Sequence, residues 1–133
     1  MGVLTVPIHL RWRDMDSFGH INNVAYLGYL EDARIALLAD GGYSPDFAGM
    51  AHMVVRHEID YLHQLAFRPE PVEADIWIEK LGQSTYEIGY LIRDGDINIL
   101  RGKTVMVCMN MESNLPGRIP AELRAKFEDL MNA

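Results

Sequence analysis

The segment DMDSFGHINNVAY, residues 14–26, gathers side chains that could do chemistry directly ahead of an apolar run. It holds two carboxylates, Asp14 and Asp16, together with His20 and two adjacent asparagines. A carboxylate can act as a nucleophile or as a general base, and a nearby histidine can orient it or exchange protons. A plain turn needs far fewer polar groups, which makes this segment the leading candidate for a functional site.

The residues before this segment have the pattern of a strand. Apolar side chains occupy the even positions from 4 to 12, and polar residues or proline occupy the odd ones. This period of two predicts a strand with one buried face. Pro7 has no N–H to donate, so we expect the strand to lie at a sheet edge or to carry a bulge.

The residues after the segment predict a buried helix. Asn22 or Asn23 can cap its start, and Gly41-Gly42 is a good signal for its end. The run VAYLGYLEDARIALLAD between them has few charges before Asp40, namely Glu31, Asp32 and Arg34. A helix that is apolar on nearly all sides is expected to be buried.

The rest of the chain predicts strands and one short helix. Period-two alternation marks residues 54–62, 72–81, 85–93 and 97–111, and Asp94-Gly95 is a hairpin signal between the last two. In the first of these, Val55, His57, Ile59 and Tyr61 would share one face. Residues 120–131 form an amphipathic helix with a stripe of Leu123, Phe127, Leu130 and Met131. The expected class is α+β, a curved antiparallel sheet wrapped around a long central helix, with a short C-terminal helix.

Composition excludes several function classes. The 133 residues are 49% hydrophobic with a net charge of −7, which argues against a basic nucleic-acid-binding face. The single cysteine, Cys108, lies in an apolar strand and is expected to be a buried, inert thiol. No secretory signal is visible, and the apolar runs are too short to span a bilayer. We therefore expect one cytoplasmic domain covering residues 1–133, with no membrane partner.

The polar segment and the helix after it carry a resemblance to a known family. Strand, D-x-D-x-x-G-H-x-N-N-x-x-Y and helix together resemble the hotdog-fold thioesterases, and among them the 4-hydroxybenzoyl-CoA thioesterase-like acyl-CoA thioesterases. The matching residues are Asp14, Asp16, Gly19, His20, Asn22, Asn23, Tyr26, Tyr29, Glu31, Ala33 and Arg34. HEIDYLHQL and LGQSTYEI also resemble the family, so the likeness extends over nearly the whole chain.

The resemblance implies roles for these residues. Asp16 would be the nucleophile or the general base in hydrolysis of an acyl-CoA, and the residues leave these two mechanisms open. The helix N-terminus near Asn23 would polarise the thioester carbonyl, and His20 would orient Asp16 or contact the substrate. Substrate contacts would come from Gly19, Asn22 and Tyr26. No metal site or other cofactor is expected, because coenzyme A is itself part of the substrate.

Other readings of the acidic residues remain open. Asp16 could simply bond the backbone of its own turn, and Asp14 is expected to tie the turn to the sheet. Glu31 is an alternative catalytic acid, because a second branch of the family uses a helix glutamate. It lies about 12 Å along the helix from Asn23, so it would have to act from a partner subunit. We prefer an i,i+3 pair with Arg34.

The resemblance also implies partners. The protein would be a homodimer or homotetramer with sites at the dimer interface, where Ser84 and Thr85 would reach the neighbour's site, or else bond their own turn. The basic residues available for coenzyme A phosphates are Arg56, Arg68, Arg101, Lys103 and Arg118, and the sequence does not choose among them. Two rival functions remain: a hotdog hydratase or dehydratase using Asp16 and His20, and a non-catalytic acyl-CoA-binding module.

Overall fold

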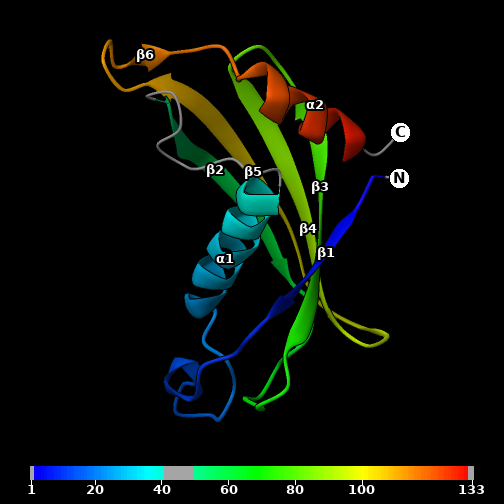
Figure 1. Cartoon of the computed structure of the whole chain (residues 1–133). Coiled ribbons are helices and arrows are strands. Elements are labelled where there is room, and N and C mark those ends of the chain that lie inside the picture. Colours follow the sequence, from blue (N-terminus) through cyan, green and yellow to red (C-terminus); the bar gives the residue numbers. More distant parts are fainter. Residues whose placement is uncertain (1, 41–49, 132–133) are drawn as a thin grey trace.

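A computed structural model describes residues 2–40 and 50–131 of the chain (Figure 1). The elements follow in the order β1 (Leu4–Ile8), the 3-10 helix η1 (Trp12–Asp14), α1 (Ala25–Asp40), β2 (Met50–Tyr61), β3 (Val72–Leu81), β4 (Thr85–Asp94), β5 (Ile97–Asn110), β6 (Leu115–Pro116) and α2 (Ala121–Asp129). The predicted end of the long helix at residues 41–42 lies outside the described residues. The two-residue β6 was not predicted.

All the strands join one antiparallel sheet. Its order is β1-β3-β4-β5-β2, with β6 paired to the far end of β5. The edge position of β1 confirms the expectation from Pro7, which lies opposite Glu73 of β3. The predicted hairpin joins β4 to β5, and Gly95 adopts the left-handed φ of 59° that its turn requires. The sheet therefore has two edges, β1 and β2.

The sheet curves around α1, which lies on its concave face (Figure 1). Period-two alternation places one set of side chains from each strand on this face, and on β3 these are Val72, Ala74, Ile76 and Ile78, all essentially buried. Tyr29, Leu30, Ala33 and Leu37 of α1 pack against this layer and are also fully buried. The predicted α+β architecture, with the long helix inside a curved sheet, is confirmed.

One side of α1 remains exposed, which corrects the expectation of a helix buried all round. Ile35 is 53% exposed, and Leu27 and Glu31 lie on the same open side. Arg34 is only 8% exposed and donates to Tyr90 Oη of β4 at 3.2 Å. Arg34 therefore points into the core while Glu31 points outward, so the expected i,i+3 pair between them is wrong.

The C-terminal helix α2 packs across β3 and β4. Leu123, Phe127 and Leu130 of the predicted stripe are buried, and the Phe127 ring lies 4.5 Å from that of Tyr86, centroid to centroid. Met131, also predicted in the stripe, is 37% exposed because it follows the end of the helix. Within the described residues, no helix is long and apolar enough to cross a membrane.

Candidate functional site

The polar segment forms a closed loop between η1 and α1. Met15 and Ile21 pair as an isolated antiparallel bridge, and inside it the N–H of Asp16 donates to the carbonyl of His20 at 2.8 Å. The N–H of Gly19 returns to the carbonyl of Asp16 at 3.1 Å. Gly19 has a φ of 80°, a conformation that side chains rarely adopt, so glycine is needed for this turn. The loop is therefore held by its own backbone.

The Asp16 side chain both bonds this loop and remains open to solvent. Its Oδ1 accepts from the N–H of Phe18 at 2.9 Å and from the N–H of His20 at 3.3 Å. The whole residue is exposed. Two backbone N–H groups on one carboxylate oxygen fix the direction of the carboxylate, because an Asp that bonds the backbone two residues ahead is locked into an Asx turn. Asp16 can therefore both stabilise its turn and act as the catalytic carboxylate.

The start of α1 is capped by Asn22. Its Oδ1 accepts from the N–H of Val24 at 2.9 Å, and its carbonyl accepts from the N–H of Ala25, also at 2.9 Å. Asn22 thus caps the turn of residues 22–25 that leads into α1, and Asn23 is the second residue of that turn. Within residues 2–40 and 50–131, no group accepts a hydrogen bond from the N–H of Asn23. This N–H can therefore bind an oxygen atom of a ligand.

Asp14 anchors the loop to the helix and not, as expected, to the sheet. Its Oδ2 accepts from Tyr29 Oη at 2.8 Å and from Arg11 Nε at 2.9 Å. Burial, followed by the hydrogen bond to Asp14, raises the pKa of Tyr29 to about 12, so its hydroxyl stays protonated and donates. Asp14 therefore orients the loop on α1, and its carboxylate is already engaged.

A cleft of about 650 Å³ lies between this loop, the start of α1 and the end of β2. Its walls are formed by Asp16, Phe18, His20, Ile21, Asn23, Tyr26, Tyr61, Leu62, His63 and Gln64. Four residues predicted from the sequence thus share one cleft: Asp16, His20, Asn23 and Tyr26. Burial raises the pKa of Tyr26 to about 12, which keeps its hydroxyl neutral.

The second wall of the cleft, residues 61–64, is not predicted from the sequence. Tyr61 ends β2 and residues 62–64 follow it, and the N–H groups of Leu62 and His63 both donate to the carbonyl of Ile99. The N–H of Ile21 donates to the carbonyl of Leu65 at 2.7 Å and joins the two walls. The segment HEIDYLHQL resembles the family, but this resemblance implies no role for its residues.

Several predicted site residues lie outside this cleft. Gly19 and Asn22 shape its loop and helix start without lining it. Glu31 is exposed on the open side of α1. Thr85 lies at the start of β4 and lines another hollow, of about 410 Å³, while the carbonyl of the adjacent Ser84 accepts from the N–H of Cys108. Neither hydroxyl shares a cleft with Asp16 within one chain.

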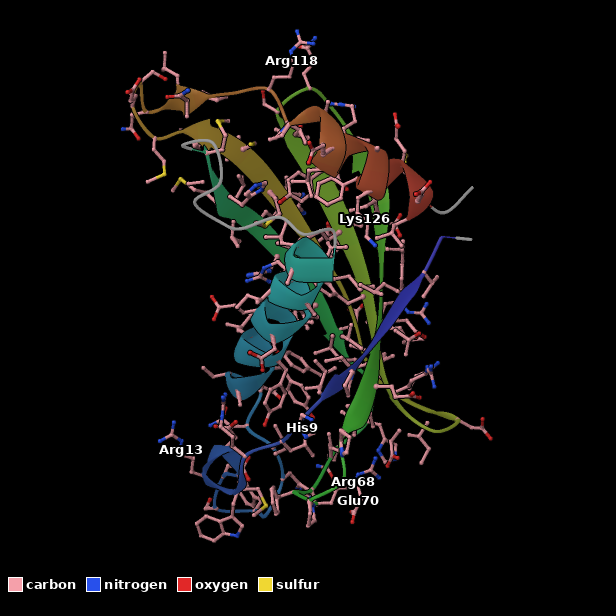
Figure 2. All side chains as sticks on the ribbon, in the orientation of Figure 1. His9, Arg13, Arg68, Glu70, Arg118 and Lys126 are labelled. Carbon is pink, nitrogen blue, oxygen red and sulfur yellow. The ribbon has the colours of Figure 1, made fainter. Side chains whose placement is uncertain are left out.

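The basic residues considered for phosphate binding are mostly engaged. Arg56 pairs with Glu58 at 3.1 Å, and Arg68 pairs with Asp94 at 2.7 Å. Lys103 Nζ lies 3.9 Å from the carboxylate of Glu87. Arg118 lies at the end of the molecule opposite the loop that carries Arg13 (Figure 2). In the described part of the chain, no group of three or more His, Cys, Asp or Glu side chains has the arrangement of a metal site.

Two histidines on the inner face of β2 predict acid sensitivity. Burial lowers the pKa of His52, whose Nδ1 lies 2.6 Å from Tyr86 Oη, to about 4. Burial and then the charge of Arg34 lower the pKa of His57. Below pH ~6.5 these histidines bind protons in the unfolded chain before they do so in the folded one. The free energy of unfolding should therefore decrease as the pH falls from ~6.5 to ~4.

This decrease can be measured by urea unfolding at several pH values in that range. His52 should account for at most about 3 kcal/mol of it, so His52→Gln should flatten the dependence of the unfolding free energy on pH. Equal slopes for the wild type and His52→Gln would show that burial of His52 does not cause the acid sensitivity.

Comparison with known proteins places this fold in a class. The model of the thioesterase-like superfamily matches residues 10–127. The PA5185 protein from Pseudomonas aeruginosa PAO1 is 29% identical, with a TM-score of 0.89 over 98% of this chain and 92% of that one. A predicted thioesterase from Bacillus stearothermophilus is 26% identical, with a TM-score of 0.82 over 98% and 97%.

A thioesterase from Thermus thermophilus, solved with coenzyme A and Zn, is 28% identical, with a TM-score of 0.77 over 95% of this chain and 92% of that one. No curated protein sequence matches the chain. The architecture is that of the hotdog fold, which confirms the predicted fold class. The chain belongs to the thioesterase-like superfamily and is a thioester hydrolase.

Proposed function

We propose that the protein is an acyl-CoA thioesterase that hydrolyses its substrate to a free acid and coenzyme A. One observation carries this proposal: two residues line the same cleft, the exposed Asp16 with its carboxylate and Asn23 with a backbone N–H that donates to no group of the described residues. The first can attack a carbonyl carbon or activate water, and the second can bind the oxygen that becomes negative. The thioesterase from Thermus thermophilus that binds coenzyme A supports the choice of a coenzyme A ester.

The reaction then needs two groups of the chain. Either Asp16 attacks the thioester carbon and forms a mixed anhydride that water hydrolyses, or it takes a proton from the water that attacks. On either route the carbonyl electron pair moves to oxygen, where the N–H of Asn23 stabilises it. When the carbonyl re-forms, the C–S bond breaks and its electron pair leaves on the coenzyme A sulfur, which takes a proton from solvent. His20 borders the cleft and orients the carboxylate or the acyl group.

We further propose that two copies of the chain build the complete site. The edge strand β2 carries the exposed apolar residues Met53, Val54 and Val55, and α1 adds Leu27 and Ile35. An unpaired edge with apolar side chains favours association with a second copy. Ser84 and Thr85 would then reach the cleft of the partner. Analytical ultracentrifugation should give a dimer or tetramer, and a monomer at micromolar concentration would contradict this arrangement.

The proposed function is tested by thiol release from short, long and aromatic acyl-CoAs, with coenzyme A binding measured in parallel. We expect turnover of at least one acyl class. Binding without turnover would instead support the acyl-CoA-binding module. Water addition to an enoyl-CoA without thiol release would support the hydratase.

A further inference from the structure

Tyr61, the last residue of β2, contacts the start of α1 across the cleft. Its hydroxyl donates to the backbone carbonyl of Asn23, with Oη and O 3.1 Å apart. The residue is 45% exposed and lines the cleft beside Asn23. Tyr61 therefore links the end of a sheet strand to Asn23, the residue whose N–H we propose as the oxyanion donor.

This bond holds the peptide unit on the C-terminal side of Asn23. On the N-terminal side of Asn23, the backbone carbonyl of Asn22 accepts from the N–H of Ala25. The side-chain Oδ1 of Asn22 accepts from the N–H of Val24. These bonds hold the peptide unit that carries the N–H of Asn23. The hydroxyl of Tyr61 holds the next peptide unit through its carbonyl. The direction of the N–H is thereby defined relative to β2 as well as to the helix.

Aromatic packing holds the Tyr61 ring in place for this contact. Its centroid lies 5.8 Å from that of Tyr26, and the Tyr26 ring in turn meets Tyr29 edge to face at 5.7 Å. Tyr29 donates to Asp14 at the base of the loop that carries Asp16. Aromatic contacts and hydrogen bonds thus link Tyr61 to both sides of the cleft.

We propose that Tyr61 is a positioning residue for thioester hydrolysis, acting through Asn23 and not on the substrate. This inference rests on the proposed function. An oxyanion donor is effective only when its N–H points at the place where charge develops, so a loosened helix start lowers the rate of the chemical step. Substrate binding depends little on this donor, because the negative charge exists only in the transition state.

The test compares kcat, KM and thermal unfolding of Tyr61→Phe with those of the wild type. We expect kcat to fall about tenfold with KM within about twofold. The unfolding temperature should hardly change, because a hydrogen bond at an exposed residue contributes little to stability. Tyr90→Phe is the matched control: it removes a buried hydroxyl bonded to Arg34 and Thr104, and should lower the unfolding temperature without lowering kcat.

A double-mutant cycle shows whether Tyr61 acts through Asn23. Asn23→Pro removes the N–H, so Tyr61→Phe should have no further effect on kcat in that background. Equal effects in both backgrounds, or a Tyr61→Phe enzyme with the kcat of an active wild type, would overturn the inference and leave the proposed function standing. Absence of thiol release by the wild type from every acyl-CoA would overturn both.

Discussion

Replacing Asn23 with proline is expected to lower kcat for thiol release by about 100-fold or more. Proline has no backbone N–H, so the variant lacks the group that we propose binds the oxyanion. Asn23 is the second residue of the turn 22–25 that precedes α1, a turn position that favours proline, and its N–H donates to no group of the described residues. The cap bond from Val24 to Asn22 does not involve Asn23, so the helix start is expected to fold normally.

Asn23→Ala is the matched control for this prediction. It removes the side chain but keeps the N–H, so we expect kcat within a few-fold of the wild type. Thermal unfolding of both variants should stay close to the wild-type transition. A proline variant with wild-type kcat would show that the N–H of Asn23 is not the oxyanion donor. A large loss in both variants would assign the effect to the amide side chain.

The sequence predicted the parts of the site that lie close together along the chain. The polar loop, its glycine with positive φ and the asparagine cap have local causes, so residues 14–26 were sufficient to indicate them. The contact of Tyr61 with Asn23 was not predicted, because these residues are 38 positions apart in the sequence. They meet only after α1 and β2 have formed. Such a contact depends on sheet register, which local periodicity does not fix.

Register also explains an error within β2. The alternation of Val55, His57, Ile59 and Tyr61 suggested one shared face. The pairing of β2 with β5 shifts between Val54 and Arg56, so Val55 is the extra residue of a β-bulge and is exposed. His57, Ile59 and Tyr61 keep the common face. The bulge adds a residue that the period-two pattern cannot reveal.

The burial of α1 was overestimated for a different reason. Its apolar composition shows that most sides avoid water, but it does not show whether this chain or another covers them. Ile35 and Leu27 remain exposed in one chain. The composition therefore reflects the association we propose as much as the fold of one chain.

Substituting Asp16 with asparagine should lower activity at least as much as Asn23→Pro. Asn keeps an Oδ1 that can accept from the N–H groups of Phe18 and His20, so the loop geometry is preserved. The amide can neither form the anhydride nor take a proton from water at neutral pH. Glu31→Gln is the parallel variant, because it removes the alternative acid on the open side of α1. We expect it to retain wild-type kcat.

The measurement that tests the account most directly is thiol release from the preferred acyl-CoA by the wild type, Asp16→Asn and Glu31→Gln in one assay. The folded state of each protein is checked by thermal unfolding. The account predicts that Asp16→Asn loses about 100-fold or more in kcat while Glu31→Gln loses almost nothing. Equal rates for the wild type and a folded Asp16→Asn would contradict it.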